Sequence, residues 1–419
     1  MRTTDITKLP RSPRERLESL HLARDLKMAR SAHAYVRGST QHFYDWLEQH
    51  GEAVLPSGPP LWICGDCHVG NMGPVGSSTG KAVIELRDLD QTVIGNPAYD
   101  LVRLGLSLAM AARSSDLPGV TTAHMTEHLV NGYEKAFEGE RPSEDPADLP
   151  NPIGLVMRTA LKRNWRALQE ERLLDEPRFP LGKKFWPLMD EERDAVASLV
   201  AQEGLRRLVT KLDGRSDEGQ IRLLDAAYWV KGCSSLGLWR AAALVELSVP
   251  GKKGKSHRMR SLIDIKEAIE AWAPAAHRAR LPHDHAERVV TGARKIAPAL
   301  GGRMIASGVL GHRVFVRELL PQDLKVELDE LTADEGREVA RYLGVVVGRA
   351  HARQMSAPDR ASWLAELTGH RTKNIDAPIW LWQAVIRLVA DHEHAYLEHC
   401  RRYALGLSRN GGKPGAAAA

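Results

Sequence analysis

The sequence has few cysteines, no long apolar run and no apolar segment at its start. Four cysteines in 419 residues do not make the disulfide framework of a small secreted scaffold, so we expect reduced thiols. No stretch approaches the roughly 20 apolar residues of a membrane helix, and the first residues lack the apolar region of a signal peptide. We therefore expect a cytoplasmic protein with no membrane partner.

Aromatic residues are also scarce, at 5% of the chain, and basic residues form no long run. Nucleic-acid-binding proteins typically show a basic patch, a recognition motif or aromatic side chains on which bases stack. We therefore expect no nucleic-acid partner. The formal net charge of +5 nevertheless suits an anionic ligand such as a nucleotide.

Two of the cysteines, Cys64 and Cys67, form a C-x-x-C pair. A structural zinc site would need a second ligand pair at suitable spacing, and none is visible. A redox pair would be expected to open a thioredoxin-like unit, which this pair does not do. We interpret both cysteines as incidental reduced thiols beside an aspartate.

The polar side chains that bear on chemistry are concentrated in residues 61–104. A short apolar strand (61–63) leads into a polar loop, and a second strand (82–86) ends just before two more acids. The polar side chains that follow these two strands are Asp66, His68, Asn71, Asp88 and Asp90. A carboxylate can accept a hydroxyl proton, and carboxylate and amide oxygens are the ligands that Mg²⁺ prefers. The spacing of Asp66, Asn71 and Asp88 is that of the catalytic base and the two metal ligands of protein kinases.

This stretch resembles the catalytic and metal-binding segments of aminoglycoside and choline phosphotransferases, within the protein-kinase-like superfamily, with Cys64 in place of the usual histidine. Over residues 27–354 the chain more closely resembles a bacterial family, domain of unknown function 2252. The residues that carry this second resemblance are 27–31, 37–38, 64–66, 87–90, 266–268 and 349–353.

The resemblance implies ATP and Mg²⁺ as cofactors and a role for each polar residue of the stretch. Asp66 would be the base or the group that orients the hydroxyl, and His68 would stabilise the transferring phosphoryl group. Asn71 and Asp88 would bind the metal, with Asp90 assisting. Asp100, which follows in the sequence P-A-Y-D-L, would support the catalytic loop through hydrogen bonds.

The sequence changes character at residue 221, where it reads as strand, glycine-rich turn and strand. Small residues in such a turn let backbone N–H groups approach phosphate oxygens. The candidates for this contact are Gly232, Ser234, Ser235 and Gly237. A basic hairpin loop is expected at 251–255.

The strand after this hairpin carries Lys266, which we expect to hold phosphates as a point charge. A helix at 283–300 follows, and Glu287 is our choice for the partner of Lys266, with Glu267 and Glu270 as competitors. The next strands, near 308–310 and 313–320, would lead into the hinge of a kinase-like small lobe.

The order of these parts differs from that of a standard kinase, in which the glycine-rich hairpin and its lysine precede the catalytic loop. Here they follow it, and the helix at 335–354 comes later still. We interpret the order as a circular permutation, the alternative being that one of the two resemblances is false. We expect an α+β, kinase-like two-lobe fold with a helical lobe (1–215), a small β-rich lobe (216–330) and further large-lobe helices with a disordered tail (331–419).

Other residues have structural interpretations. His351 is expected to be a hydrogen-bonded core histidine, and Arg37 to contact phosphate or carboxylate or to tie two helices together. Residues 101–212 and 379–407 are expected to be mainly helical, with a loop at 138–152. A mobile arm is expected at 1–12.

Taken together, these observations predict an ATP- and Mg²⁺-dependent phosphotransferase that acts on an unidentified hydroxyl acceptor, with a small molecule favoured over a protein. Two alternatives remain open. One is a non-catalytic, nucleotide-binding regulator of the pseudokinase type. The other is an enzyme of the same fold that transfers AMP.

Overall fold

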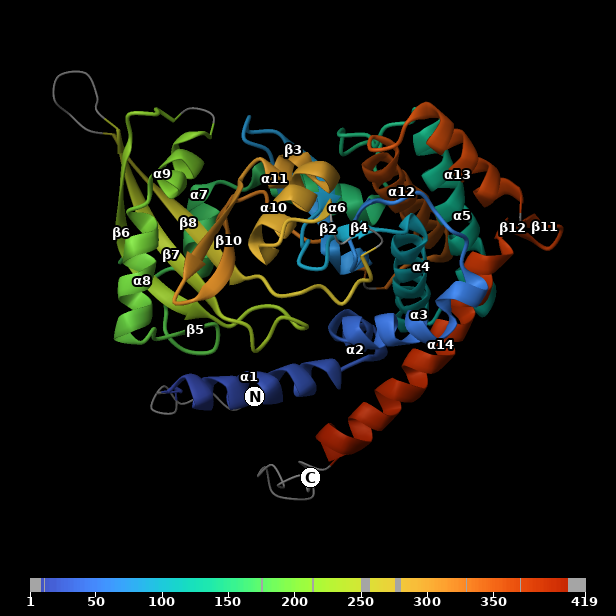
Figure 1. Ribbon diagram of the computed structural model, residues 1–419, viewed down its shortest axis with the longest axis horizontal. Coiled ribbons are helices and arrows are strands. Elements are labelled where there is room, and N and C mark those ends of the chain that lie inside the picture. The colour runs from blue at the N-terminus through green and yellow to red at the C-terminus, as the bar shows by residue number, and fades with distance from the viewer. Residues whose placement is uncertain are drawn as a thin grey trace.

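The computed structural model describes residues 9–10, 12–174, 176–212, 215–249, 257–275, 280–328, 330–369 and 371–405. The structure is of the α+β class, as expected, with a sheet at one end and a group of helices at the other (Figure 1). No helix in the described part of the chain is long and apolar enough to cross a membrane. The expected basic loop at 251–255 and the end of the tail lie outside the described residues, as does most of the arm at 1–12.

The larger sheet has six strands in the order β5-β6-β7-β8-β10-β9, and every neighbouring pair is antiparallel. β6, β7 and β8 form a meander of long strands, and β10 pairs with β8 from the other side. The strands are β5 (Phe185–Trp186), β6 (Gln220–Trp229), β7 (Arg240–Val249), β8 (His257–Glu267), β9 (Met304–Val309) and β10 (His312–Leu319).

Apolar residues line both faces of this sheet, because helices cover both. Successive residues of a strand point to opposite faces, and Tyr228 and Trp229 of β6 accordingly belong to different apolar clusters. One face packs on α8 (Asp190–Val200) and α9 (Glu203–Thr210), and the other on α7 (Trp165–Arg172). α1 (Pro13–Met28) joins the first cluster through Leu20.

The sheet therefore packs on helices that lie well before position 216 in the sequence. α8 and α9 share a core with β6, β7 and β8, and the buried ion pair between Arg16 and Glu192, 2.8 Å, ties α1 to α8. A division at 215/216 would cut through this core. The β-rich part thus extends back to α7 and includes α1.

The other part of the molecule is built from helices around α4, which is buried along nearly its whole length. The largest apolar cluster surrounds this helix and holds its neighbours together. The helices outside the sheet layers are α2 (Ala32–Gly38), α3 (Thr40–Val54), α4 (Pro97–Ser114), α5 (Gly119–Phe137), α6 (Asn151–Lys162), α10 (His285–Ile296), α11 (Pro298–Gly301), α12 (Ala333–Ala352), α13 (Ala357–Gly369) and α14 (Ile379–His399), which continues as a π-helix (Cys400–Leu405).

Three short antiparallel strand pairs complete the fold. The strands of two of these pairs flank the polar loops at 64–71 and 87–92. β1 pairs with β4, and β2 pairs with β3, all antiparallel. The strands are β1 (Leu61–Ile63), β2 (Met72–Gly76), β3 (Ala82–Leu86), β4 (Val93–Gly95), β11 (Arg371–Thr372) and β12 (Ile375–Pro378), and a 3₁₀ turn, η2 (Val69–Asn71), precedes β2. The two strands expected at 61–63 and 82–86 are confirmed.

Glycines let α5 and α12 approach each other closely. A Cβ on Gly132 of α5 would overlap the carbonyl oxygen of Arg341 on α12. Gly132→Ala should therefore lower the free energy of unfolding by about 1–3 kcal/mol, since two helix backbones must separate.

Gly119→Ala is the matched control for this substitution, because it lies on the same helix with nothing within 4 Å of the added methyl group. It should be neutral or stabilising by up to about 1 kcal/mol. Urea denaturation followed by circular dichroism measures both, and equal stability of the two variants would rule out the close approach.

Candidate active site

A cavity lies where three loops meet. The first is the Asp66 loop (residues 64–71), the second is the Asp88 loop (87–92), and the third is the glycine loop (230–239) between β6 and β7. The first two come from the helical part and the third from the sheet. The cavity is lined by Lys27, Arg37, Asp66, His68, Gly70, Asn71, Arg87, Asp88, Asp90, Gln91, Lys231, Gly232, Cys233, Ser234, Ser235, Arg240, Arg317 and Lys325.

Asp100 fixes the start of the Asp66 loop, as expected. Its carboxylate accepts hydrogen bonds from the backbone N–H groups of Cys64 (2.8 Å) and Gly65 (3.0 Å). Gly65 has a φ of 76°, and a Cβ there would overlap the carbonyl oxygen of Gln91 in the Asp88 loop. The glycine thus lets the two loops touch.

His351 is the hydrogen-bonded core histidine that we expected. It is fully buried, and its Nε2 lies 3.1 Å from a carboxylate oxygen of Asp100. Its Nδ1 lies 2.9 Å from the hydroxyl of Tyr133. The end of α12 therefore supports the carboxylate that supports the Asp66 loop.

Asp66 is held by two side chains that the sequence analysis did not single out. Arg103 Nε donates to one carboxylate oxygen at 2.9 Å, and Thr40 Oγ1 donates to the other at 3.1 Å. Burial raises the pKa of Asp66 above its usual value, although Arg103 and Thr40 act in the opposite direction. The result is an oriented carboxylate with increased affinity for a proton.

His68 lines the cavity but does not form a hydrogen bond with Asp66. Its Nε2 is 3.8 Å from the nearer carboxylate oxygen, and its Nδ1 is buried without a partner among the described residues. Burial lowers the pKa of His68 well below its usual value, and Arg37 and Arg103 lower it further. A neutral His68 can donate an N–H but supplies no positive charge.

Asn71 has a free oxygen in a buried position. Its Nδ2 donates to the carbonyl oxygens of Asp66 (3.1 Å) and Asp88 (2.6 Å), which can only accept and therefore fix the orientation of the amide. The opposite atom, Oδ1, is buried and has no hydrogen-bond partner among the described residues. An oxygen left unpaired in this way is suited to bind a hard cation.

Lys266 lies beside both acids of the Asp88 loop. Its Nζ is 3.2 and 3.4 Å from the two carboxylate oxygens of Asp88 and also contacts Asp90 Oδ2. The structure thus brings together residues separated by more than 170 positions. Asp90 Oδ1 is buried and unpaired within the described part of the chain, like Asn71 Oδ1.

The two acids differ in their affinity for protons. The Asp88 side chain is open to solvent in the cavity, but the protein atoms that surround it there work to raise its pKa; the charge of Lys266 outweighs this effect, and the pKa lies well below its usual range. Burial and the charge of Asp88 raise the pKa of Asp90 to about 7. Asp88 is therefore the permanent negative charge of the pair.

The glycine loop contributes three of the four residues expected to cover phosphates. Gly232, Ser234 and Ser235 line the cavity, and Lys27 Nζ donates to the carbonyl oxygen of Gly232 at 2.6 Å. Gly237 does not line it. A Cβ on Gly237 would lie 2.9 Å from Nε2 of His21, so this glycine faces α1 instead.

The expected pairing of Lys266 with Glu287 is wrong. Glu287 is exposed in the first turn of α10, whereas the neighbouring Arg288 points inward. Arg288 Nη2 donates to the carbonyl oxygens of Asp90 (2.9 Å) and Ile269 (2.8 Å). Successive side chains on a helix point about 100° apart. The side chain of α10 that contacts the Asp88 loop is therefore Arg288 and not the carboxylate of Glu287.

Of the two competing glutamates, Glu267 is also engaged elsewhere. Its carboxylate lies 2.7 Å from Nδ1 of His312 and accepts from the backbone N–H of Trp239 at 2.7 Å. Within the described part of the chain, Lys266 forms ion pairs with Asp88 and Asp90. Asp90 therefore occupies the position that we had assigned to Glu287.

The sequence profile of a bacterial family described as an uncharacterized protein conserved in bacteria, DUF2252, matches residues 16–402. The chain belongs to the DUF2252 family. No curated protein and no solved structure matches it.

The DUF2252 cavity is rich in cations, most of which the sequence analysis did not single out. Asp264 holds two of them, accepting from Arg240 at 2.8 and 2.6 Å and from Arg317 at 3.2 Å. Burial, and then the charge of Arg240, lowers the pKa of Lys231 well below its usual value. Their positions in the sequence could have indicated this role, since Lys231 lies near the start of the glycine loop and Arg240 directly follows its end.

The donor set of this DUF2252 site fits Mg²⁺. Asn71 Oδ1 and Asp90 Oδ1 are buried oxygens without hydrogen-bond partners among the described residues, and the Asp88 side chain is 55% exposed. Oxygen ligands of this kind suit a hard cation. Burial raises the pKa of both Cys64 and Cys67, so neither thiol is prepared to act as a thiolate ligand.

Proposed function

We propose that this DUF2252 protein binds ATP with Mg²⁺ in the cavity and transfers a phosphoryl group to a hydroxyl acceptor. The observation that carries the proposal is the contact of Lys266 with Asp88, which itself lines the cavity together with the glycine loop. A triphosphate and a divalent cation need cationic, N–H and oxygen-ligand groups within one small space. Here two distant parts of the chain supply them.

The charge of the cavity supports a polyanionic ligand. Among the described residues, seven lysine and arginine side chains and three carboxylates line it. Burial lowers the pKa of Lys231 most, the charge of Arg240 lowers it further, and a bound anion would act in the opposite direction. ATP, with its triphosphate chain, fits such a surplus of basic groups.

The order of elements in the sheet supports a kinase-like small lobe. A hairpin with a glycine-rich turn (β6 and β7) is followed by a strand with a lysine (β8) and then by a helix (α10). In protein kinases the glycine-rich loop covers the phosphates and the lysine lies on the third strand. This protein departs from that pattern at α10, because Lys266 pairs with Asp88 and Asp90 and not with a carboxylate of this helix.

The meeting of α12 with β1 supports a circular permutation. The side chain of Gln354, just after α12, accepts from the backbone N–H of Trp62 and donates to its carbonyl oxygen, both at 3.0 Å. In a standard kinase order, this helix would run directly into the catalytic loop. Here 292 positions separate two residues that lie side by side.

The chain's own groups have distinct tasks in this proposal. The acceptor hydroxyl gives its proton to Asp66, its oxygen forms a bond with the γ-phosphorus, and the bond from that phosphorus to the ADP oxygen breaks. The raised pKa of Asp66 favours proton acceptance. Lys266 and the backbone of the glycine loop hold the phosphates, and Asn71 and Asp88 would hold Mg²⁺, which adds positive charge where negative charge develops.

Calorimetric titration with ATP, with and without Mg²⁺, tests the proposal. Wild-type protein should bind ATP, and Mg²⁺ should strengthen the binding. Lys266→Met should weaken it by about 10- to 100-fold, because a charge-assisted phosphate contact contributes about 1.5–3 kcal/mol.

Lys162→Met, at an exposed position outside the cavity, is the matched control and should bind like wild type. Thermal unfolding of both variants shows whether they remain folded. A folded wild-type protein that binds no nucleotide would refute the proposal. Binding without turnover would favour the non-catalytic regulator, and the mass of a modified acceptor would distinguish phosphoryl from AMP transfer.

A further inference from the structure

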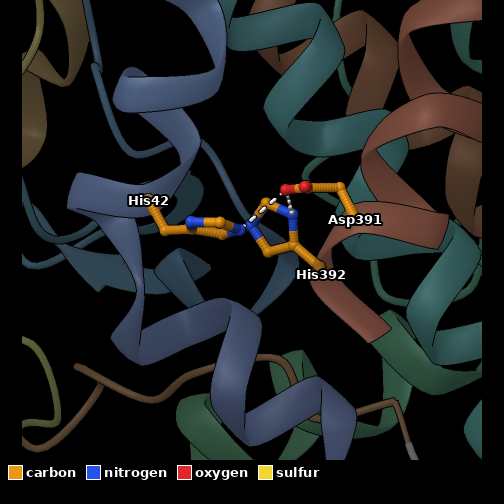
Figure 2. A group of neighbouring side chains, drawn as sticks. All are labelled: His42, Asp391 and His392. Carbon is orange, nitrogen blue, oxygen red and sulfur yellow. Dashed lines mark ion pairs between the residues drawn. The ribbon is translucent and has the colours of Figure 1, made fainter. Parts of the chain in front are cut away.

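A second group of side chains that can bind a metal ion lies outside the cavity, between α3 and α14. His42 of α3 and Asp391 and His392 of α14 converge on one point (Figure 2). Ligand-type atoms, one from each residue, lie within 4.8 Å of one another. Nothing in the proposed phosphoryl transfer uses these residues.

His392 presents an unpaired nitrogen at this point. The side chain is fully buried, and its Nδ1 lies 3.0 Å from the carbonyl oxygen of Leu388. A carbonyl oxygen can only accept, so Nδ1 carries the proton and Nε2 keeps its lone pair. Nε2 is buried and has no hydrogen-bond partner in the part of the chain that the structure describes.

His42 and Asp391 are close together but poorly aligned for a hydrogen bond. His42 Nε2 lies 2.7 Å from Asp391 Oδ2, yet both atoms lack a hydrogen-bond partner of acceptable geometry among the described residues. Three atoms that can each donate an electron pair therefore face one another without satisfying one another. A buried nitrogen and a carboxylate in this state are costly unless something binds them.

We propose that His42, Asp391 and His392 form a site for Zn²⁺. Two imidazole nitrogens and one carboxylate oxygen are a donor set typical of zinc sites that keep the fourth position open. The hydrogen bond from His392 Nδ1 to a backbone carbonyl is the usual way in which a zinc-bound histidine is oriented. Mg²⁺ prefers oxygen ligands and is the wrong ion for this set.

The site can adjust to the ion and exchange it. Two ligands at about 2.0 Å from a tetrahedral ion are about 3.3 Å apart. Asp391 Oδ2, which is 2.7 Å from His42 Nε2, therefore has to move outward by roughly 0.6 Å, and a separation as wide as 4.8 Å has to shorten by roughly 1.5 Å. Its side chain is 39% exposed and that of His42 is 32% exposed, which leaves room for the movement and for a water as fourth ligand.

The ion would join distant parts of the chain. His42 lies two positions after Thr40, which holds Asp66, whereas His392 lies near the end of the described chain. Zn²⁺ would thus brace α3 against α14. The site does not depend on the proposed phosphoryl transfer, because the Mg²⁺ ligands are different residues.

The test is a Zn²⁺ titration of full-length, untagged protein after treatment with a chelator, with a chromophoric chelator as competitor and elemental analysis for stoichiometry. Wild type should bind one Zn²⁺ per chain, unaffected by excess Mg²⁺, and its melting temperature should rise with Zn²⁺. His42→Gln and Asp391→Asn, both at partly exposed positions, should each weaken binding at least about tenfold.

Two controls locate the ion. His394→Gln, an exposed histidine on the same helix, should bind Zn²⁺ like wild type. Asp88→Asn should also bind normally, which separates this site from the cavity. The proposal is overturned if wild type binds no Zn²⁺, or if His42→Gln and Asp391→Asn bind as well as His394→Gln does, because the ion then lies elsewhere.

Discussion

Replacing Asp66 by asparagine should reduce the turnover of Mg·ATP by about 10²- to 10⁴-fold while ATP still binds. Asparagine keeps the shape of the side chain, and its Oδ1 can still accept from Arg103, which now donates at 2.9 Å. Its amide cannot accept the acceptor's proton. Because no acceptor is assigned, the slow hydrolysis of Mg·ATP by water serves as the measured reaction.

Asp194→Asn is the matched control for this experiment, since it makes the same chemical change at an exposed position on α8. Its turnover should equal that of wild type, and calorimetry should show the same ATP affinity for all three proteins. If Asp66→Asn hydrolysed ATP at the wild-type rate, Asp66 would not be the base. If it lost binding as well, its role would be structural.

Asp100→Asn should lower the free energy of unfolding by about 3–5 kcal/mol, the largest stability effect that we expect. Asp100 is fully buried and accepts from two backbone N–H groups, at 2.8 and 3.0 Å. An amide group in its place turns one acceptor into a donor that faces another N–H. Its contact with His351, now 3.1 Å, is also changed.

Chemical denaturation measures this loss, with Asp194→Asn again as the control, which should lie within about 0.5 kcal/mol of wild type. Because the Asp66 loop depends on Asp100, turnover should fall in the variant even where it is fully folded. A variant as stable as Asp194→Asn would show that Asp100 does not hold the loop.

Much of the architecture could be predicted because it depends on local patterns. The strands at 61–63 and 82–86 follow from short apolar runs that end in polar residues, and the structure has them at those bounds. The juxtaposition of Lys266 and Asp88 could be inferred because a lysine on a strand after a glycine-rich hairpin has a known chemical use.

The details that could not be predicted depend on packing between distant segments. Whether Glu287 or Arg288 points inward is set by a rotation of one residue, which helix periodicity near a helix start does not resolve. Arg103 lies on the buried helix α4 and looks like an interruption of an apolar face until Asp66 is placed beside it. His42 and Asp391 lie side by side although they are almost 350 positions apart, and no local sequence pattern predicts this contact.

The most direct test of the account is a crystal structure with a non-hydrolysable ATP analogue and Mn²⁺ as an anomalous scatterer in place of Mg²⁺. We predict a metal peak about 2.1 Å from Asn71 Oδ1 and from a carboxylate oxygen of Asp88. We also predict phosphates between Lys266 and residues 232–235. A nucleotide bound elsewhere, or a saturated crystal in which Lys266 keeps its ion pairs with Asp88 and Asp90 and contacts no phosphate, would contradict the account.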